Sequence, residues 1–213
     1  MKFIRELILE GKIPRFRTIK LIALVLSFLP IPVFFLAKVS PRDYAELGWN
    51  FLIGIMLIRP LADVFPGIRI LRSLVPFRKE FGIAAAWFMV LHSYGAFAAQ
   101  GKNLLAVFDA KYWHLNHPLL WGILGFFCVL LLLFTSNMFS MKLLKQNWKR
   151  VQRLSYPLFF FVAVHIALIS GRWSKVMVPV LAVMILWTLA KLKIKVPLFV
   201  KSEPDVISEL NSK

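Results

Sequence analysis

The chain has 213 residues, of which 59% are hydrophobic and 17% charged, and its mean hydropathy is +0.72. Soluble domains are roughly 45–50% apolar and about 25% charged, so this composition excludes an ordinary soluble protein and predicts an integral membrane protein. The formal net charge of +17 does not indicate nucleic-acid binding, because the basic residues follow the predicted membrane topology. The single cysteine, Cys128, excludes a disulfide within the chain.

Six apolar runs are each long enough to cross a hydrocarbon core of ~30 Å. They occupy residues 19–38, 45–62, 81–100, 119–139, 154–171 and 176–192. We therefore predict an all-α membrane protein whose six-transmembrane-helix bundle covers 19–192. A basic N-terminal segment (1–18) precedes the bundle and a short tail (193–213) follows it. The tail is too short for a nucleotide-binding domain, which needs roughly 100 residues or more.

The distribution of positive charge predicts the orientation of the chain. If the N-terminus lies inside, 21 of the 27 Lys and Arg residues fall on inside segments and 6 on outside segments. Cytoplasmic loops carry the excess of Lys and Arg in membrane proteins. We therefore predict an N-in, C-in, multi-pass protein of the inner (plasma) membrane, with its inside charges close to membrane lipid.

Two of the four histidines, His92 and His165, lie inside predicted spans. His92 follows Phe81, the start of the third span, at the same offset as His165 follows Leu154, the start of the fifth. Odd-numbered spans run in the same direction, and a helix rises ~1.5 Å per residue, so both rings are expected roughly 17 Å above the inner boundary. Either histidine alone could be a hydrogen-bonded packing residue. Two at one depth indicate a shared site.

A haem fits this pair better than an isolated metal ion does. No carboxylate or thiolate lies near either histidine in the sequence, so an isolated ion has too few ligands. A haem supplies four equatorial nitrogens and needs only two axial ligands from the protein. We predict a haem between the third and fifth helices, with His92 and His165 as its axial iron ligands. Small and adaptable residues on the face of His92 are expected to leave room for it: Ala85, Phe88, Met89, Gly95, Ala96 and Ala99.

Arg172 follows His165 by about two helical turns, on the same helix face and roughly 10 Å further outward. It is a candidate partner for a haem propionate, and the alternative is an ordinary charge of the outer loop. His114 and His117 lie in the outer loop. They are either solvated or take part in contacts with a propionate or a docking partner.

Three stretches of the sequence resemble a known family. They are RKEFGIAAAWFMVLHSYGAF (78–97), LLLLFTSN (130–137) and NWKRVQRLSYPLFFFVAVHIAL (147–168). With the six-span layout, they resemble the ferric-reductase-like transmembrane superfamily over roughly residues 40–190. Within it, they resemble the haem-binding membrane subunit of the protein-methionine-sulfoxide reductase system.

One departure from the family pattern bears on the number of haems. The family has two histidines in the fifth span, and the position of the first, near the inner end, is Gln152 here. The corresponding positions before His92 on the third span are Lys79 and Arg78. An inner haem, which two-haem members of the superfamily carry, therefore lacks both expected ligands. We expect one haem b.

The resemblance implies an electron-transfer subunit of an oxidoreductase rather than a complete enzyme. Its electrons come from a cytoplasmic flavin reductase, a bound FMN or a membrane quinol, with Arg78, Lys79 and Arg153 as candidate contacts unless they only mark the cytoplasmic face. Its acceptor is a periplasmic molybdenum-cofactor enzyme that repairs oxidised methionine. Three alternatives remain: a stand-alone ferric or other metal reductase using the same haem, a transporter whose histidines relay protons without haem, and an assembly protein without a cofactor.

Overall fold

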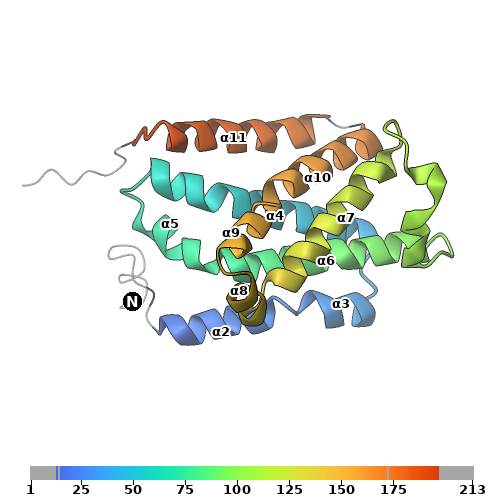
Figure 1. Cartoon of the computed structure of the whole chain (residues 1–213), viewed down its shortest axis with the longest axis horizontal. Coiled ribbons are helices and arrows are strands. Elements are labelled where there is room, and N and C mark those ends of the chain that lie inside the picture. The colour runs from blue at the N-terminus through green and yellow to red at the C-terminus, as the bar shows by residue number, and fades with distance from the viewer. Residues whose placement is uncertain (1–12, 14, 172, 197–213) are drawn as a thin grey trace, which may run out of the picture.

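The computed structural model describes residues 13, 15–171 and 173–196, and this part of the chain is helical (Figure 1). Its α-helices are α2 (Phe16–Leu26), α3 (Pro30–Leu36), α4 (Pro41–Val64), α5 (Arg69–Leu74), α6 (Arg78–Ala98), α7 (Pro118–Thr135), α8 (Met138–Leu144), α9 (Gln146–Gln152), α10 (Ser155–Ser170) and α11 (Trp173–Lys191). Short 3-10 turns lie at η2 (Val75–Phe77), η3 (Leu104–Phe108) and η4 (Ala110–Tyr112).

The structure confirms the six predicted spans. Six helical stretches in the described residues are long and apolar enough to cross a membrane: Phe16–Leu36, Pro41–Val64, Arg69–Ala98, Pro118–Thr135, Gln146–Ser170 and Trp173–Lys191. Each of them overlaps one of the apolar runs found in the sequence.

Some span boundaries differ from the prediction. The third span begins at Arg69 rather than near residue 81, because α5, η2 and α6 follow one another without a loop. Long basic side chains can extend to the interface from within such a helix. The fourth span ends at Thr135 rather than at 139, because the Asn137 side chain accepts a hydrogen bond from the Ser140 N–H at 2.7 Å and caps α8.

Two helix pairs form the centre of the bundle. α4 packs most extensively on α6, and α7 packs on α10. α11 covers α4, while α2 and α3 lie along α6 (Figure 1). α6 and α10 make little direct contact in the described part of the chain, and both pack instead on α7 and α4. The core lies where these four helices meet, and there the Trp49 ring stacks on Phe159 with their centroids 5.2 Å apart.

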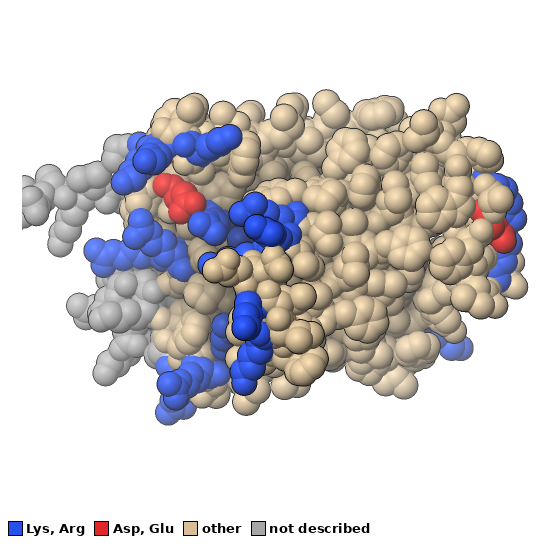
Figure 2. All heavy atoms as spheres, viewed as in Figure 1, with Lys and Arg blue, Asp and Glu red and all other residues tan. Residues whose placement is uncertain are grey.

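The two ends of the bundle differ in charge. Lys and Arg gather at the end where α6 begins and α4 ends (Figure 2). We call this the basic end and the opposite one the far end. α6 and α10 both run from the basic end to the far end, as the third and fifth spans of an antiparallel series must (Figure 1).

Tyr44 joins the first two spans to α6. It is 1% exposed, and its hydroxyl donates a 2.7 Å hydrogen bond to the Pro30 carbonyl. Its ring lies edge-on to Phe34 and Phe88, at centroid distances of 5.1 and 5.2 Å. Because Tyr44 lies one turn after Pro41, it also fixes the start of α4.

We expect Tyr44→Ala to lower the free energy of unfolding by about 3–5 kcal/mol, because it removes a buried ring. Tyr44→Phe should cost about 1 kcal/mol, the contribution of one hydrogen bond. Thermal unfolding in detergent micelles measures both, with Tyr94→Ala as the control because that ring is 43% exposed. Equal melting temperatures for Tyr44→Ala and Tyr94→Ala would contradict this role for Tyr44.

Candidate functional site

The structure places His92 on α6 and His165 on α10, the third and fifth spans, as the sequence predicted. Both rings are half-buried, and they lie within electrostatic range of each other. α6 and α10 run parallel to each other, and both pack on α7 (Figure 1).

Each imidazole is held by the same kind of hydrogen bond. His92 Nδ1 lies 2.8 Å from the Pro41 carbonyl oxygen, and His165 Nδ1 lies 3.0 Å from the Pro118 carbonyl oxygen. A carbonyl can only accept, so in both rings Nδ1 carries the proton and donates it. Nε2 has no hydrogen-bond partner among the described residues in either ring and keeps its lone pair.

The two carbonyls come from equivalent places in the fold. Pro41 and Pro118 are the first residues of α4 and α7, and each follows a capping residue. The Ser40 side chain accepts from the Asp43 N–H, and His117 Nδ1 accepts from the Leu119 N–H. Proline suits the first helical position because its missing N–H has no partner to lose there. The first residues of α4 and α7 therefore place their carbonyl groups beside the two histidines.

A glycine lies beside each of these contacts. A Cβ added at Gly122 on α7 would lie 2.7 Å from Cε1 and 2.8 Å from Nδ1 of His165. A Cβ added at Gly95 on α6 would lie 2.7 Å from Pro41 Cγ and 3.0 Å from Phe34 Cζ. Gly122 gives room to the His165 ring itself, and Gly95 gives room to the proline whose carbonyl holds His92.

These contacts correct one expectation from the sequence. Gly95 was expected to leave space for a macrocycle, but the side chains of Pro41 and Phe34 fill that space. Gly122 was not predicted at all, because it lies on α7 and its closeness to His165 follows from helix packing. The only available signal was a glycine within an otherwise bulky apolar span.

The chemistry of the donor set fits a haem. Metal-binding histidines usually donate one ring N–H to a carbonyl or carboxylate and bind the metal through the other nitrogen. His92 and His165 both have this arrangement. No group of three or more His, Cys, Asp or Glu side chains that could hold an isolated ion is found in the described residues. The residues that could hold the cofactor are therefore the two histidines.

The family described as ferric reductase like transmembrane component matches residues 43–164, more than half of the chain; the matched range includes His92 and ends one residue before His165. The chain belongs to this family. Since the family is a transmembrane component and the structure has six suitable helices, the protein is a multi-pass membrane protein.

Comparison with curated proteins agrees with this assignment. The chain is 27% identical over 147 residues to proteins named protein-methionine-sulfoxide reductase heme-binding subunit MsrQ from Brucella ovis, Brucella canis and Brucella suis. The aligned part covers 67% of this chain and 63% of each relative. The chain thus spans somewhat less than two thirds of the length of these relatives. No solved structure matches the chain.

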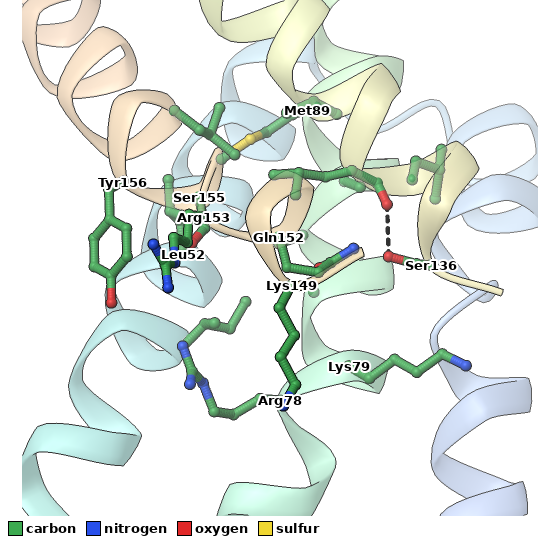
Figure 3. A pocket seen from close by; sticks show the side chains of 18 of the residues that line it. Leu52, Arg78, Lys79, Met89, Ser136, Lys149, Gln152, Arg153, Ser155 and Tyr156 are labelled. Carbon is green, nitrogen blue, oxygen red and sulfur yellow. Dashed lines mark hydrogen bonds between the residues drawn. The ribbon is translucent and has the colours of Figure 1, made fainter. Parts of the chain in front are cut away.

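A cavity of about 520 Å³ opens at the basic end of this ferric reductase-like chain (Figure 3). We call it the basic-end pocket. Its lining includes Met89, one helical turn before His92, so it extends toward the histidine pair without including it. Arg78, Lys79 and Arg153, singled out from the sequence, all line it. Two further cations that the sequence did not single out, Arg59 and Lys149, also line it.

Gln152 lies in the wall of this pocket. Its Nε2 donates to Thr135 Oγ1 at 3.3 Å, and Trp148 Nε1 donates to the Thr135 carbonyl at 2.9 Å. These bonds join α9 to the end of α7. An amide nitrogen has no free lone pair for iron, and neither His nor Cys is found among the residues that line the pocket.

The other candidate residues from the sequence are not part of the histidine pair. Arg172 lies outside the described residues. His114 is exposed. His117 caps α7, as described above, and its ring lies edge-on to Tyr112 at 5.3 Å. His117 therefore has a structural role next to Pro118, the residue that holds His165.

In the loop around His117, two lysine side chains contact Tyr112. Lys102 Nζ donates a 2.9 Å hydrogen bond to the Tyr112 hydroxyl, and this bond is the largest cause of a lowered pKa for Tyr112. Lys111 lies over the same ring, 4.9 Å from its centroid. The loop that precedes Pro118 is thus anchored on Tyr112.

Proposed function

We propose that this chain is a haem b-binding electron-transfer subunit of a membrane oxidoreductase. One observation carries the proposal: two histidines on parallel helices that both pack on α7 each donate Nδ1–H to a proline carbonyl, and neither Nε2 has a hydrogen-bond partner among the described residues. The named relatives are heme-binding subunits, which supports the same cofactor. We propose one haem per chain, because Gln152 replaces the histidine that a second haem needs.

In such a reaction, the residues of this chain would hold the haem and tune the properties of its iron. A bound haem supplies a one-electron couple between ferric and ferrous iron. The Pro41 and Pro118 carbonyls fix the orientation of the two rings and raise the donor strength of Nε2. Gly122 and Gly95 allow the helices to approach closely enough for those bonds.

We propose that the basic end faces the cytoplasm, with both termini on the cytoplasmic side of the inner membrane. This direction follows from the positive-inside rule and agrees with the gathering of charge in Figure 2. Electrons then enter at the basic end from a cytoplasmic flavin reductase, FMN or a quinol. With the inside negative, outward transfer of an electron is favoured by ~2.3 kcal/mol per 100 mV.

The acceptor that we propose is a periplasmic molybdenum-cofactor enzyme that reduces methionine sulfoxide in proteins, which rests on the name of the relatives. Arg172 is proposed to contact a haem propionate near the far end. A second candidate function, a stand-alone ferric reductase, is supported by the family description, which names ferric reductase.

One experiment separates these functions. The purified protein is reduced with dithionite in anaerobic buffer, and its haem bands are followed after addition of either a periplasmic methionine sulfoxide reductase with its substrate or ferric citrate. The proposal expects rapid reoxidation with the first and slow reoxidation with the second. The reverse order supports the ferric reductase, and a colourless protein supports a proton-relay transporter.

A further inference from the structure

The same arrangement of a capping residue and a proline occurs beside each histidine of the pair. Ser40 precedes Pro41 at the start of α4, and His117 precedes Pro118 at the start of α7. The two starts come from different loops of the chain. In both, the proline carbonyl accepts the hydrogen bond from one histidine of the pair. The capping residue is therefore next to the group that orients the ring.

Each cap stabilises the first turn of its helix. The first N–H groups of a helix have no partner within the helix, and a side chain that accepts from one of them holds the turn in place. Ser40 Oγ accepts from the Asp43 N–H at 3.2 Å, and His117 Nδ1 accepts from the Leu119 N–H at 3.1 Å. The proline is the first residue of that turn in both helices, so the direction of its carbonyl depends on the cap.

His117 is an unusual capping residue. Ser, Thr, Asp and Asn are preferred at this position, and a histidine can cap through Nδ1 only while the proton is on Nε2. His92 and His165 have the opposite tautomer, with the proton on Nδ1. The Tyr112 ring, which is 4% exposed, lies edge-on to the His117 ring. His117 therefore connects the loop before α7 to the first turn of this helix.

The helix and the histidine share each proline carbonyl. A carbonyl oxygen has two lone pairs, and the backbone of the helix needs only one of them. The other accepts the Nδ1–H of His92 at 2.8 Å or of His165 at 3.0 Å. If the first turn of the helix opens, the carbonyl turns away and the Nδ1–H loses its partner. No second hydrogen bond to either ring is found in the described part of the chain, so the orientation of each ring depends on this contact.

We propose that Ser40 and His117 are positioning residues for the histidine pair. Ser40 fixes the hydrogen bond of His92, and His117 fixes that of His165, each through the carbonyl of the proline that follows it. The effect on the iron rests on the proposed function, because a firm Nδ1–H bond raises the donor strength of a metal-binding Nε2. The hydrogen bonds themselves belong to the chain and can be measured with or without a haem.

The imidazole N–H signals of the two histidines test this crossed dependence. The full chain is labelled with ¹⁵N-histidine and studied by NMR in a neutral detergent with dithionite, which keeps any haem iron ferrous. The Nδ1–H signals are assigned by their loss in His92→Ala and His165→Ala. We expect Ser40→Ala to accelerate solvent exchange of the His92 signal, and His117→Ala that of the His165 signal, by about fivefold, the usual effect of a lost cap. In each variant the other signal should keep its rate.

Conservative variants separate positioning from a general loss of stability. Ser40→Thr and His117→Asn keep a capping side chain, and both should keep the original exchange rates. His114→Ala removes an exposed imidazole from the same loop as His117 and should change neither rate. The proposal is wrong if Ser40→Ala or His117→Ala leaves the rate of its own histidine unchanged, or accelerates both signals equally.

A haem count on the same samples separates this proposal from the proposed function. With haem bound, Ser40→Ala and His117→Ala should each shift the midpoint potential upward, because a weaker donor stabilises ferric iron less. Faster exchange at an unchanged potential would contradict the effect on the iron. An original protein without haem would contradict the proposed function, and the exchange rates would still decide whether the caps position the two rings.

Discussion

His92→Ala and His165→Ala are each expected to abolish stable haem binding. Each ring provides one of two axial nitrogens, and a haem held from one side alone is bound far more weakly. Even changes that only disturb the orientation of a metal ligand cost about 10–100-fold in affinity. The purified variants should lose the Soret band and the bands that appear on dithionite reduction, at unchanged protein yield.

His114→Ala is the matched control for these variants. It removes the same side chain from an exposed position in the loop before α7. It should keep the full absorbance spectrum. If His114→Ala loses haem while His92→Ala or His165→Ala keeps it, the assignment of the axial ligands is wrong.

Gly122→Ala is expected to weaken haem binding by about tenfold or more. Its new methyl group would come within 3 Å of two atoms of the His165 ring, at 2.7 and 2.8 Å, so the ring or α7 must move. Overpacking of this kind costs about 1–3 kcal/mol, and here the strain falls on an iron ligand. The spectrum of the ferric haem should also change, because the ring turns relative to the Pro118 carbonyl.

Two other glycines separate this effect from a general loss of stability. Gly125 lies one turn further along α7, and the Cβ added in Gly125→Ala would lie 3.4 Å from Val162 Cγ2. Gly82→Ala lies on α6, and its Cβ meets nothing within 4 Å. Both should keep the haem spectrum of the original protein. A spectrum that is unchanged in Gly122→Ala would show that this glycine does not position His165.

The sequence predicted the parts of the fold that depend on local patterns. Apolar runs predicted the six spans, because each span must satisfy its own backbone and face lipid. The sequence also predicted His92 on the third span and His165 on the fifth, and the structure confirms both placements; their common depth stays a prediction. The third span begins earlier than predicted because α5 continues through basic residues into α6.

The groups that hold the histidines could not be predicted in this way. Pro41 lies 51 residues from His92, and Pro118 lies 47 residues from His165. Nothing in either local sequence pairs them, because the contact depends on how α4 packs on α6 and α7 packs on α10. The closeness of Gly122 to His165 has the same origin.

The basic-end pocket was predicted only in part. Arg78, Lys79 and Arg153 were candidates from their place in the family pattern. Lys149 joins them because α9 folds back beneath α7, where Trp148 and Gln152 bond to Thr135. The helical reversal around α8 that brings α9 there depends on the positive φ of 47° at Lys145, a backbone angle that composition does not reveal.

The measurement that tests the central claim most directly is near-infrared magnetic circular dichroism of the oxidised, purified protein, combined with a haem count per chain. The account predicts one haem per chain with the low-spin signature of two axial imidazoles, lost in both His92→Ala and His165→Ala. A high-spin haem with one protein ligand, or a second haem that survives both substitutions, would contradict it.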